Sequence, residues 1–143
     1  MTTTNDFSFD DIEADGEILQ EFVGSANGDL TIRRAKPREG SNALALNFTF
    51  VLNNGTSPRP KLLGRIQLRN RDGSTNFEAG SFKREIEPFL KDAGLPGTLE
   101  NVCNLFTNFP CYCTFSTDSW TDSEGNLMKN IKLKKIQKEA EPF

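Results

Sequence analysis

The chain of 143 residues contains no histidine and only three cysteines. Cys103, Cys111 and Cys113 form no Cys-x-x-Cys pair, so the usual ligand spacing of a zinc site is absent. The chain also lacks a phosphate-binding P-loop and a Gly-x-Ser-x-Gly nucleophile motif. These absences predict a protein that is not an enzyme, needs no metal ion or cofactor, and acts by binding alone.

Long apolar runs are missing as well. No apolar stretch approaches the roughly 18 residues that a membrane-spanning helix needs. The first residues have neither the basic start nor the apolar stretch of a secretory signal. We therefore expect no membrane association and a cytoplasmic location. With a hydrophobic fraction of 36% and a mean hydropathy of -0.52, the chain has enough apolar material for one small core.

Basic residues are absent from the first 30 positions, which hold eight acids. All 17 Lys and Arg lie in residues 31–138 beside ten of the 20 acids, so this central part carries a formal charge of +7. A basic body between acidic ends favours a polyanionic partner. We expect residues 1–27 to form an acidic, partly disordered arm, residues 28–137 a single domain, and residues 138–143 an acidic tail.

Apolar residues alternate at period two in five segments, which predicts five strands. The segments are 29–35, 43–52, 61–69, 110–117 and 127–136. Residues 77–93 have a helical period that ends at Gly94, with a bend or break expected at Pro88 and a short second turn at 99–105. This order predicts a mainly β fold, an OB-fold-like five-stranded barrel with one helix between the third and fourth strands.

The same alternation separates the inner faces of the strands from the outer ones. Phe48 and Phe50 share a face with Leu46, so we assign them to the core, and Cys111 and Cys113 are expected to face the core as small apolar residues. The opposite faces are basic. The candidate binding residues on them are Arg33, Lys61, Arg65, Gln67, Arg69, Lys132 and Lys134.

Further cations and aromatic residues accompany this basic outer surface. Arg34, Lys36 and Arg38 lie in or near the first loop; Tyr112 projects outward from the fourth strand, and Phe77 and Trp120 are expected in neighbouring loops. Proteins that bind single strands combine cations, which follow the phosphates, with aromatic faces on which bases stack. The pattern therefore predicts binding of single-stranded DNA with little sequence specificity.

The last residues, Glu139-Ala-Glu-Pro-Phe143, resemble the acidic tip of bacterial single-stranded DNA-binding proteins, which recruits replication and repair enzymes. Together with Leu63-Gly-Arg-Ile-Gln-Leu68 and Asn130-Ile-Lys-Leu-Lys134, the layout is similar to that of small phage single-strand binders with OB-type barrels. The resemblance implies a role in DNA replication, recombination or repair in the host cytoplasm, and it is compatible with a homo-oligomer. The residues implied in contacts with replication or recombination proteins are Glu139, Glu141, Pro142 and Phe143.

A second class of function fits the same pattern. A virion-structural or protein-binding β-barrel would use the basic face to meet an acidic partner instead of nucleic acid. The sequence leaves both interpretations open.

Overall fold

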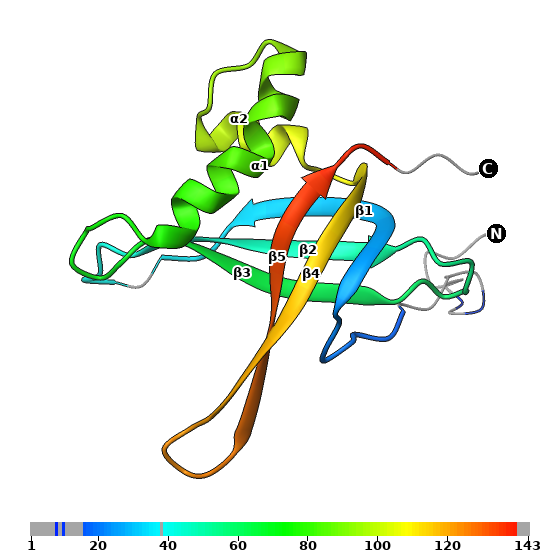
Figure 1. Ribbon diagram of the computed structural model, residues 1–143, viewed down its shortest axis with the longest axis horizontal. Helices are drawn as coiled ribbons and strands as arrows, with labels where there is room; N and C mark the ends of the chain where they lie inside the picture. The colour runs from blue at the N-terminus through cyan, green and yellow to red at the C-terminus, as the bar shows by residue number, and fades with distance from the viewer. Residues whose placement is uncertain (1–7, 9, 11–15, 38, 140–143) are drawn as a thin grey trace, which may run out of the picture.

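The computed structural model describes residues 8, 10, 16–37 and 39–139, which form a mainly β fold with two helices (Figure 1). The elements follow one another as β1 (Gly24–Arg34), β2 (Leu44–Leu52), β3 (Lys61–Arg69), α1 (Phe77–Ala93), α2 (Leu99–Leu105), β4 (Phe109–Thr121) and β5 (Leu127–Gln137). The expected order of strands is confirmed. The helix expected between the third and fourth strands is present as α1, but the count of one helix is wrong, because the short turn expected at 99–105 is a second helix, α2, capped by the side chain of Thr98.

The five strands close into a ring in the order β1-β2-β3-β5-β4. Neighbouring strands are antiparallel, except that β3 and β5 run parallel through the single pair Gly64 and Ile131. Figure 1 shows the two helices at one end of the ring and the tip of a long β4–β5 ribbon at the other. No helix in the described part of the chain is long and apolar enough to cross a membrane.

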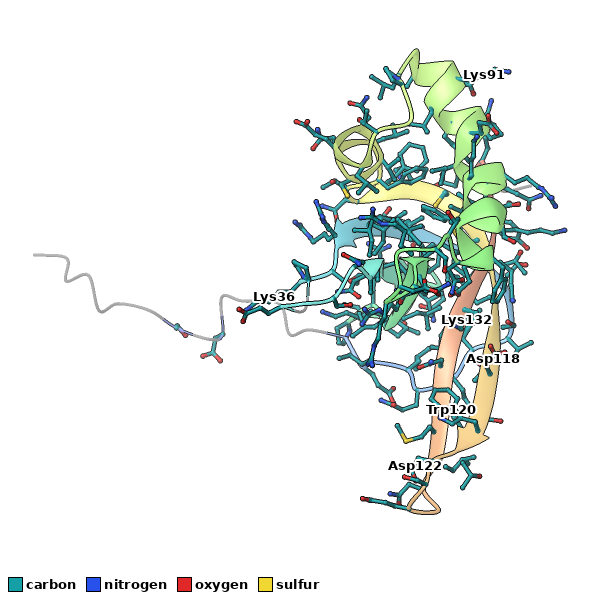
Figure 2. All side chains as sticks on the ribbon, turned by 90° about the vertical axis from the view of Figure 1, so that its left-hand side faces the viewer. Lys36, Lys91, Asp118, Trp120, Asp122 and Lys132 are labelled. Atoms are coloured by element: carbon teal, nitrogen blue, oxygen red, sulfur yellow. The ribbon has the colours of Figure 1, made fainter. Side chains whose placement is uncertain are left out.

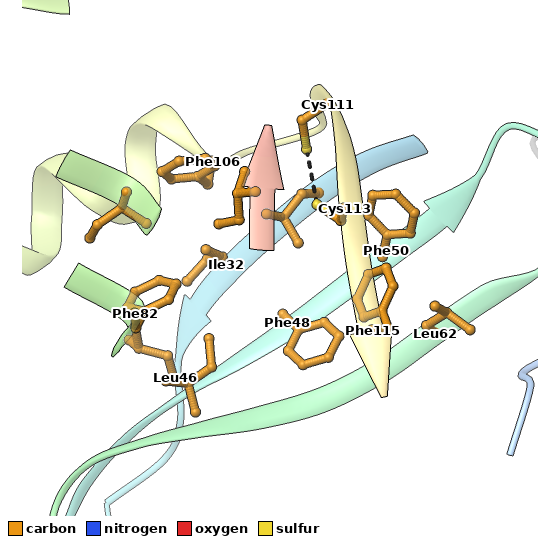
Figure 3. Packing of buried hydrophobic residues seen from close by; sticks show 14 of the residues in the cluster. Ile32, Leu46, Phe48, Phe50, Leu62, Phe82, Phe106, Cys111, Cys113 and Phe115 are labelled. Atoms are coloured by element: carbon orange, nitrogen blue, oxygen red, sulfur yellow. Dashed lines mark hydrogen bonds between the residues drawn. The ribbon is translucent and has the colours of Figure 1, made fainter. Parts of the chain in front are cut away.

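The core fills the inside of this ring with alternate residues of every strand. Phe48, Phe50 and Phe115 are at most 2% exposed, and the Phe48 and Phe50 rings lie 5.9 and 4.9 Å from that of Phe115 (Figure 3). Cys111 and Cys113 are fully buried beside them. The assignment of Phe48, Phe50 and both cysteines to the core is confirmed.

Helix α1 begins and ends as its sequence predicts. The Asn76 side chain caps its first turn by accepting from the Glu78 N–H, and Gly94 ends it in the left-handed conformation at φ 67°. Of the two alternatives expected at Pro88, the break is wrong, because one helix runs through this residue, and the bend stays a prediction. Pro88 is exposed, so its ring needs no space in the core and water can reach the backbone near it.

The first and fourth strands are longer than predicted. β1 begins at Gly24, so residues 24–27 belong to the ring and not to the N-terminal arm. Just before it, Phe22 exchanges hydrogen bonds with the Thr117 hydroxyl, its N–H donating at 2.8 Å and its carbonyl accepting at 2.9 Å. β4 runs to Thr121. Residues 118–121, which we expected in a loop, therefore form one strand of the β4–β5 ribbon and pair with β5.

Candidate functional site

The outer face of β1, β2 and β3 carries a transverse row of polar side chains. Arg33 on β1 is the ladder partner of Asn47 on β2, and Asn47 is in turn the partner of Arg65 on β3. All three side chains are exposed. Directly opposite residues in such ladders have their Cβ atoms about 5 Å apart. This row therefore presents one guanidinium group on each side of an amide.

One end of this face forms a first groove, here called the loop groove, of about 480 Å³. It lies between the loop 35–43 and the end of β3, and its polar lining includes Lys36, Ser41, Arg65, Gln67, Asn70 and Arg71. Three of these residues are cations, and no carboxylate is among the described residues that line the groove. The loop groove therefore has the charge of an anion-binding site.

A second groove of about 460 Å³, here called the helix groove, lies between the start of α1 and the strands β3 and β5. Arg65 lines it as well, beside Phe77, Lys132 and Lys134. Gly64 is the ladder partner of Ile131, so Arg65 and Lys132, the next residues, follow on neighbouring strands. Phe77 is the first residue of α1 rather than part of a loop, and its side chain is 83% exposed. The helix groove thus joins cations to an uncovered aromatic ring.

Acidic side chains partly neutralise the helix groove. The Lys132 Nζ lies 3.2 Å from a Glu78 carboxylate oxygen, and both side chains are about three-quarters buried, at 25% and 22% exposure. Glu85 accepts a hydrogen bond from the Ile136 N–H at 3.1 Å, and Asp118 also lines the groove. An anion that enters the helix groove therefore competes with Glu78 for Lys132.

Trp120 lies further along the ribbon, in β4 and not in the loop where we expected it. It pairs with Met128 of β5 and is 44% exposed. Asp118 and Trp120 lie on the same side of β4 because they are two residues apart. Figure 2 shows Lys132, Asp118 and Trp120 one after another towards the tip of the ribbon. The Trp120 ring thus continues the line of the helix groove towards the tip.

Asp122 closes the turn at the tip of the ribbon and lines neither groove. Its carboxylate accepts hydrogen bonds from the N–H groups of Glu124 and Asn126, which hold its pKa below the ordinary value. The side chain therefore stabilises the turn at residues 122–126 as an ionised acceptor.

Several predicted residues lie outside both grooves. Tyr112 points away on the β1–β4–β5 side, where its ladder partners are Asn27 and Gln137. Lys61 stands at the opposite end of β3 from Arg69, and its backbone exchanges hydrogen bonds with Glu17 and Leu19. Neither Arg34 nor Arg69 lines a groove, although both are exposed. Glu139 is exposed, and the predicted residues Arg38, Glu141, Pro142 and Phe143 lie outside the described residues.

Sequence reasoning missed several residues of this region, among them Asn47, Arg71 and Glu78. Asn47 could have been found, because the same alternation that buries Leu46 and Phe48 turns Asn47 outward. Arg71 and Glu78 had no such signal, since their places depend on how the loop 70–75 and helix α1 lie against the ring.

The described residues hold no cluster of potential metal ligands, and two of the three cysteines are buried. No three His, Cys, Asp or Glu side chains in residues 16–37 and 39–139 are grouped so that they could hold a metal ion. The Cys111 and Cys113 sulfur atoms lie 3.4 Å apart in the core. The hydrogen bond between them, together with burial, raises the pKa of Cys113 far above its ordinary value, so this thiol stays protonated.

Comparison with known proteins adds no family to this geometry. No protein-family model matches the chain, and no curated protein matches its sequence.

Proposed function

We propose that this chain is a non-catalytic single-stranded DNA-binding protein of the OB-fold type, which binds with little sequence specificity and serves DNA replication, recombination or repair. The ring order β1-β2-β3-β5-β4 and the helices between β3 and β4 support the OB-fold, a five-stranded Greek-key barrel. The binding surface in this proposal runs from the loop groove through the helix groove to Trp120.

The observation that carries the proposal is the position of Arg65, which lines both grooves. On one side of it lie Lys36 and Arg71 without a carboxylate, and on the other the ring of Phe77. A nucleic-acid strand needs both kinds of contact, because its phosphates are anionic and its bases have apolar faces. Arg65 joins the two kinds of contact in one continuous path.

The aromatic residues favour single strands over duplexes. Phe77 and Trp120 expose 83% and 44% of their surface, so both rings are open to a ligand. Only an unpaired base can lay its face on such a ring, whereas the bases of a duplex are already stacked on one another. Stacking does not depend on base identity, which accounts for low sequence specificity.

Phe77→Ala is expected to weaken binding of single-stranded DNA by about 1 to 3 kcal/mol, the usual contribution of one stacked base. Anisotropy of a labelled oligonucleotide at low salt measures the effect, with duplex DNA of the same sequence as the competitor. Val23→Ala is the matched control, because Val23 is 77% exposed and lines neither groove. Equal affinity for duplex and single strand, or equal loss in both variants, would contradict the proposal.

Glu78→Gln is expected to raise the affinity for single-stranded DNA at low salt by about three- to tenfold, because Lys132 then becomes free to meet a phosphate. Glu87→Gln makes the same charge change on α1 at an exposed position outside both grooves. The comparison uses the same anisotropy titration for both variants. An equal gain in both would mean that net charge alone changed the affinity and that Glu78 does not compete.

The contact of residues 139–143 with replication or recombination proteins stays a prediction. Within that segment only Glu139 belongs to the described residues.

A further inference from the structure

The floor of the loop groove consists of small side chains, which leaves room for a ligand between the cations. Ala35, Ala43 and Ala45 line it. The Ala35 N–H donates to the Ala45 carbonyl at 2.9 Å, so the start of the loop is held against β2 and Ala45 is only 3% exposed. Leu44, where the register of β2 and β3 shifts, lines the groove as well. The loop groove is therefore a formed hollow.

The polar neighbours of the three cations already have partners. Gln67 donates to the Arg69 carbonyl at 2.6 Å, Asn70 donates to the Ser74 hydroxyl at 3.0 Å, and the Ser41 hydroxyl accepts from the Ala43 N–H at 3.1 Å. In contrast, Lys36, Arg65 and Arg71 take part in none of the ion pairs formed among the described residues. The charge of the groove is thus uncompensated from within.

Two acids in the neighbouring loops, Glu39 before β2 and Asp72 after β3, do not neutralise the positive charge of the loop groove. Glu39 is exposed and does not line the groove. The Asp72 carboxylate accepts from the N–H and hydroxyl of Ser74, at 2.9 and 2.5 Å, and these hydrogen bonds lower its pKa. Asp72 does not line the groove either. Three cations around one hollow match a ligand with more than one negative charge.

We propose that the loop groove binds the dianionic phosphate group at the end of a nucleic-acid strand. A terminal phosphate carries a charge of about −1.5 to −2 at pH 7, compared with one charge on each internal phosphate. The groove lies where β1 ends, β2 begins and β3 ends, so a strand that follows Arg65 out of the helix groove reaches it last. The inference rests on the proposed function, because the same strand occupies both grooves.

The test compares oligothymidylates of about 12 nucleotides, a length within the range of OB-fold site sizes. One carries a 5′-phosphate, one a 3′-phosphate and one no terminal phosphate, and inorganic phosphate is the competitor that reports the free anion. We expect one of the two phosphorylated strands to bind the full chain about tenfold tighter than the strand without a terminal phosphate. In Arg71→Gln the ratio of the affinities for the phosphorylated and the unmodified strand falls from about ten to about one, and in the control Lys91→Gln the ratio is kept.

The outcomes separate this inference from the proposed function. If all three strands bind equally, the proposed function stands and the terminal-phosphate site is overturned. If no strand binds, the proposed function fails, and the site is supported only if inorganic phosphate binds to the wild type and not to Arg71→Gln. A preference that persists in Arg71→Gln places the terminal phosphate elsewhere and overturns the inference.

Discussion

Phe48→Ala is expected to lower the free energy of unfolding by about 3 to 5 kcal/mol, the usual cost of truncating a buried phenylalanine. The Phe48 side chain is 1% exposed and stacks on Phe115 at 5.9 Å with an interplanar angle of 30°. It also lies against Gly64, where a Cβ atom would collide with the Phe48 ring. The site is closely packed on several sides, so the cavity left by the truncation cannot collapse easily. Urea-induced unfolding measures the change.

Phe77→Ala is the control for this prediction, because it removes the same side chain from an exposed position. It should change the free energy of unfolding by less than about 1 kcal/mol. A stable Phe48→Ala variant that lost only DNA binding would mean that β2 is turned by one residue and that Phe48 faces outward.

Arg65→Glu is expected to weaken single-stranded DNA binding by roughly two orders of magnitude, since a charge-assisted contact of about 1.5 to 3 kcal/mol is lost and replaced by repulsion. Arg65 is exposed and lines both grooves, so the substitution interrupts the path at its centre and should leave the fold intact. The slope of log affinity against log salt should also flatten by about one phosphate contact.

Lys91→Glu is the matched control for Arg65→Glu, because it makes the same change of charge on the helical end of the molecule. Figure 2 shows Lys91 well away from Lys36, Lys132 and Trp120. We expect its effect on affinity to stay within about threefold at moderate salt, where charges more than about 10 Å away are screened. An equal loss of DNA affinity in Arg65→Glu and Lys91→Glu would mean that only net charge determines binding. It would contradict the proposal that the two grooves are the binding surface.

The sequence predicted those elements whose side chains repeat at one period along their whole length. β3 at Lys61–Arg69 and α1 at Phe77–Ala93 have the predicted bounds. The start of β1 carries no such signal, because Gly24-Ser-Ala-Asn-Gly28 has little apolar alternation and is held in the sheet by its pairing with β4. The end of β4 was missed for the same reason, since its polar residues belong to a strand only through their partners on β5.

The candidate site could be predicted where it depends on the strands alone. Alternation along β1 and β3 indicated that Arg33 and Arg65 face outward, and both are exposed. Alternation does not tell which outward faces lie together once the sheet closes into a ring. Tyr112 and Arg65 both point outward, yet Tyr112 lies on the β1–β4–β5 side and lines neither groove. The contact of Glu78 with Lys132 was missed for the same reason, because it depends on how helix α1 packs against β5.

The most direct test of the central claim is a salt titration of single-stranded DNA binding to the full chain, followed by the emission of Trp120 and by the anisotropy of a labelled oligonucleotide. The account predicts saturable binding whose log affinity falls linearly with log salt, with a slope of about −3 if Lys36, Arg65, Arg71 and Lys134 each meet a phosphate. It also predicts a change in emission as the strand reaches the ribbon. No binding by either probe at micromolar protein and low salt would contradict the account and favour a protein-binding module.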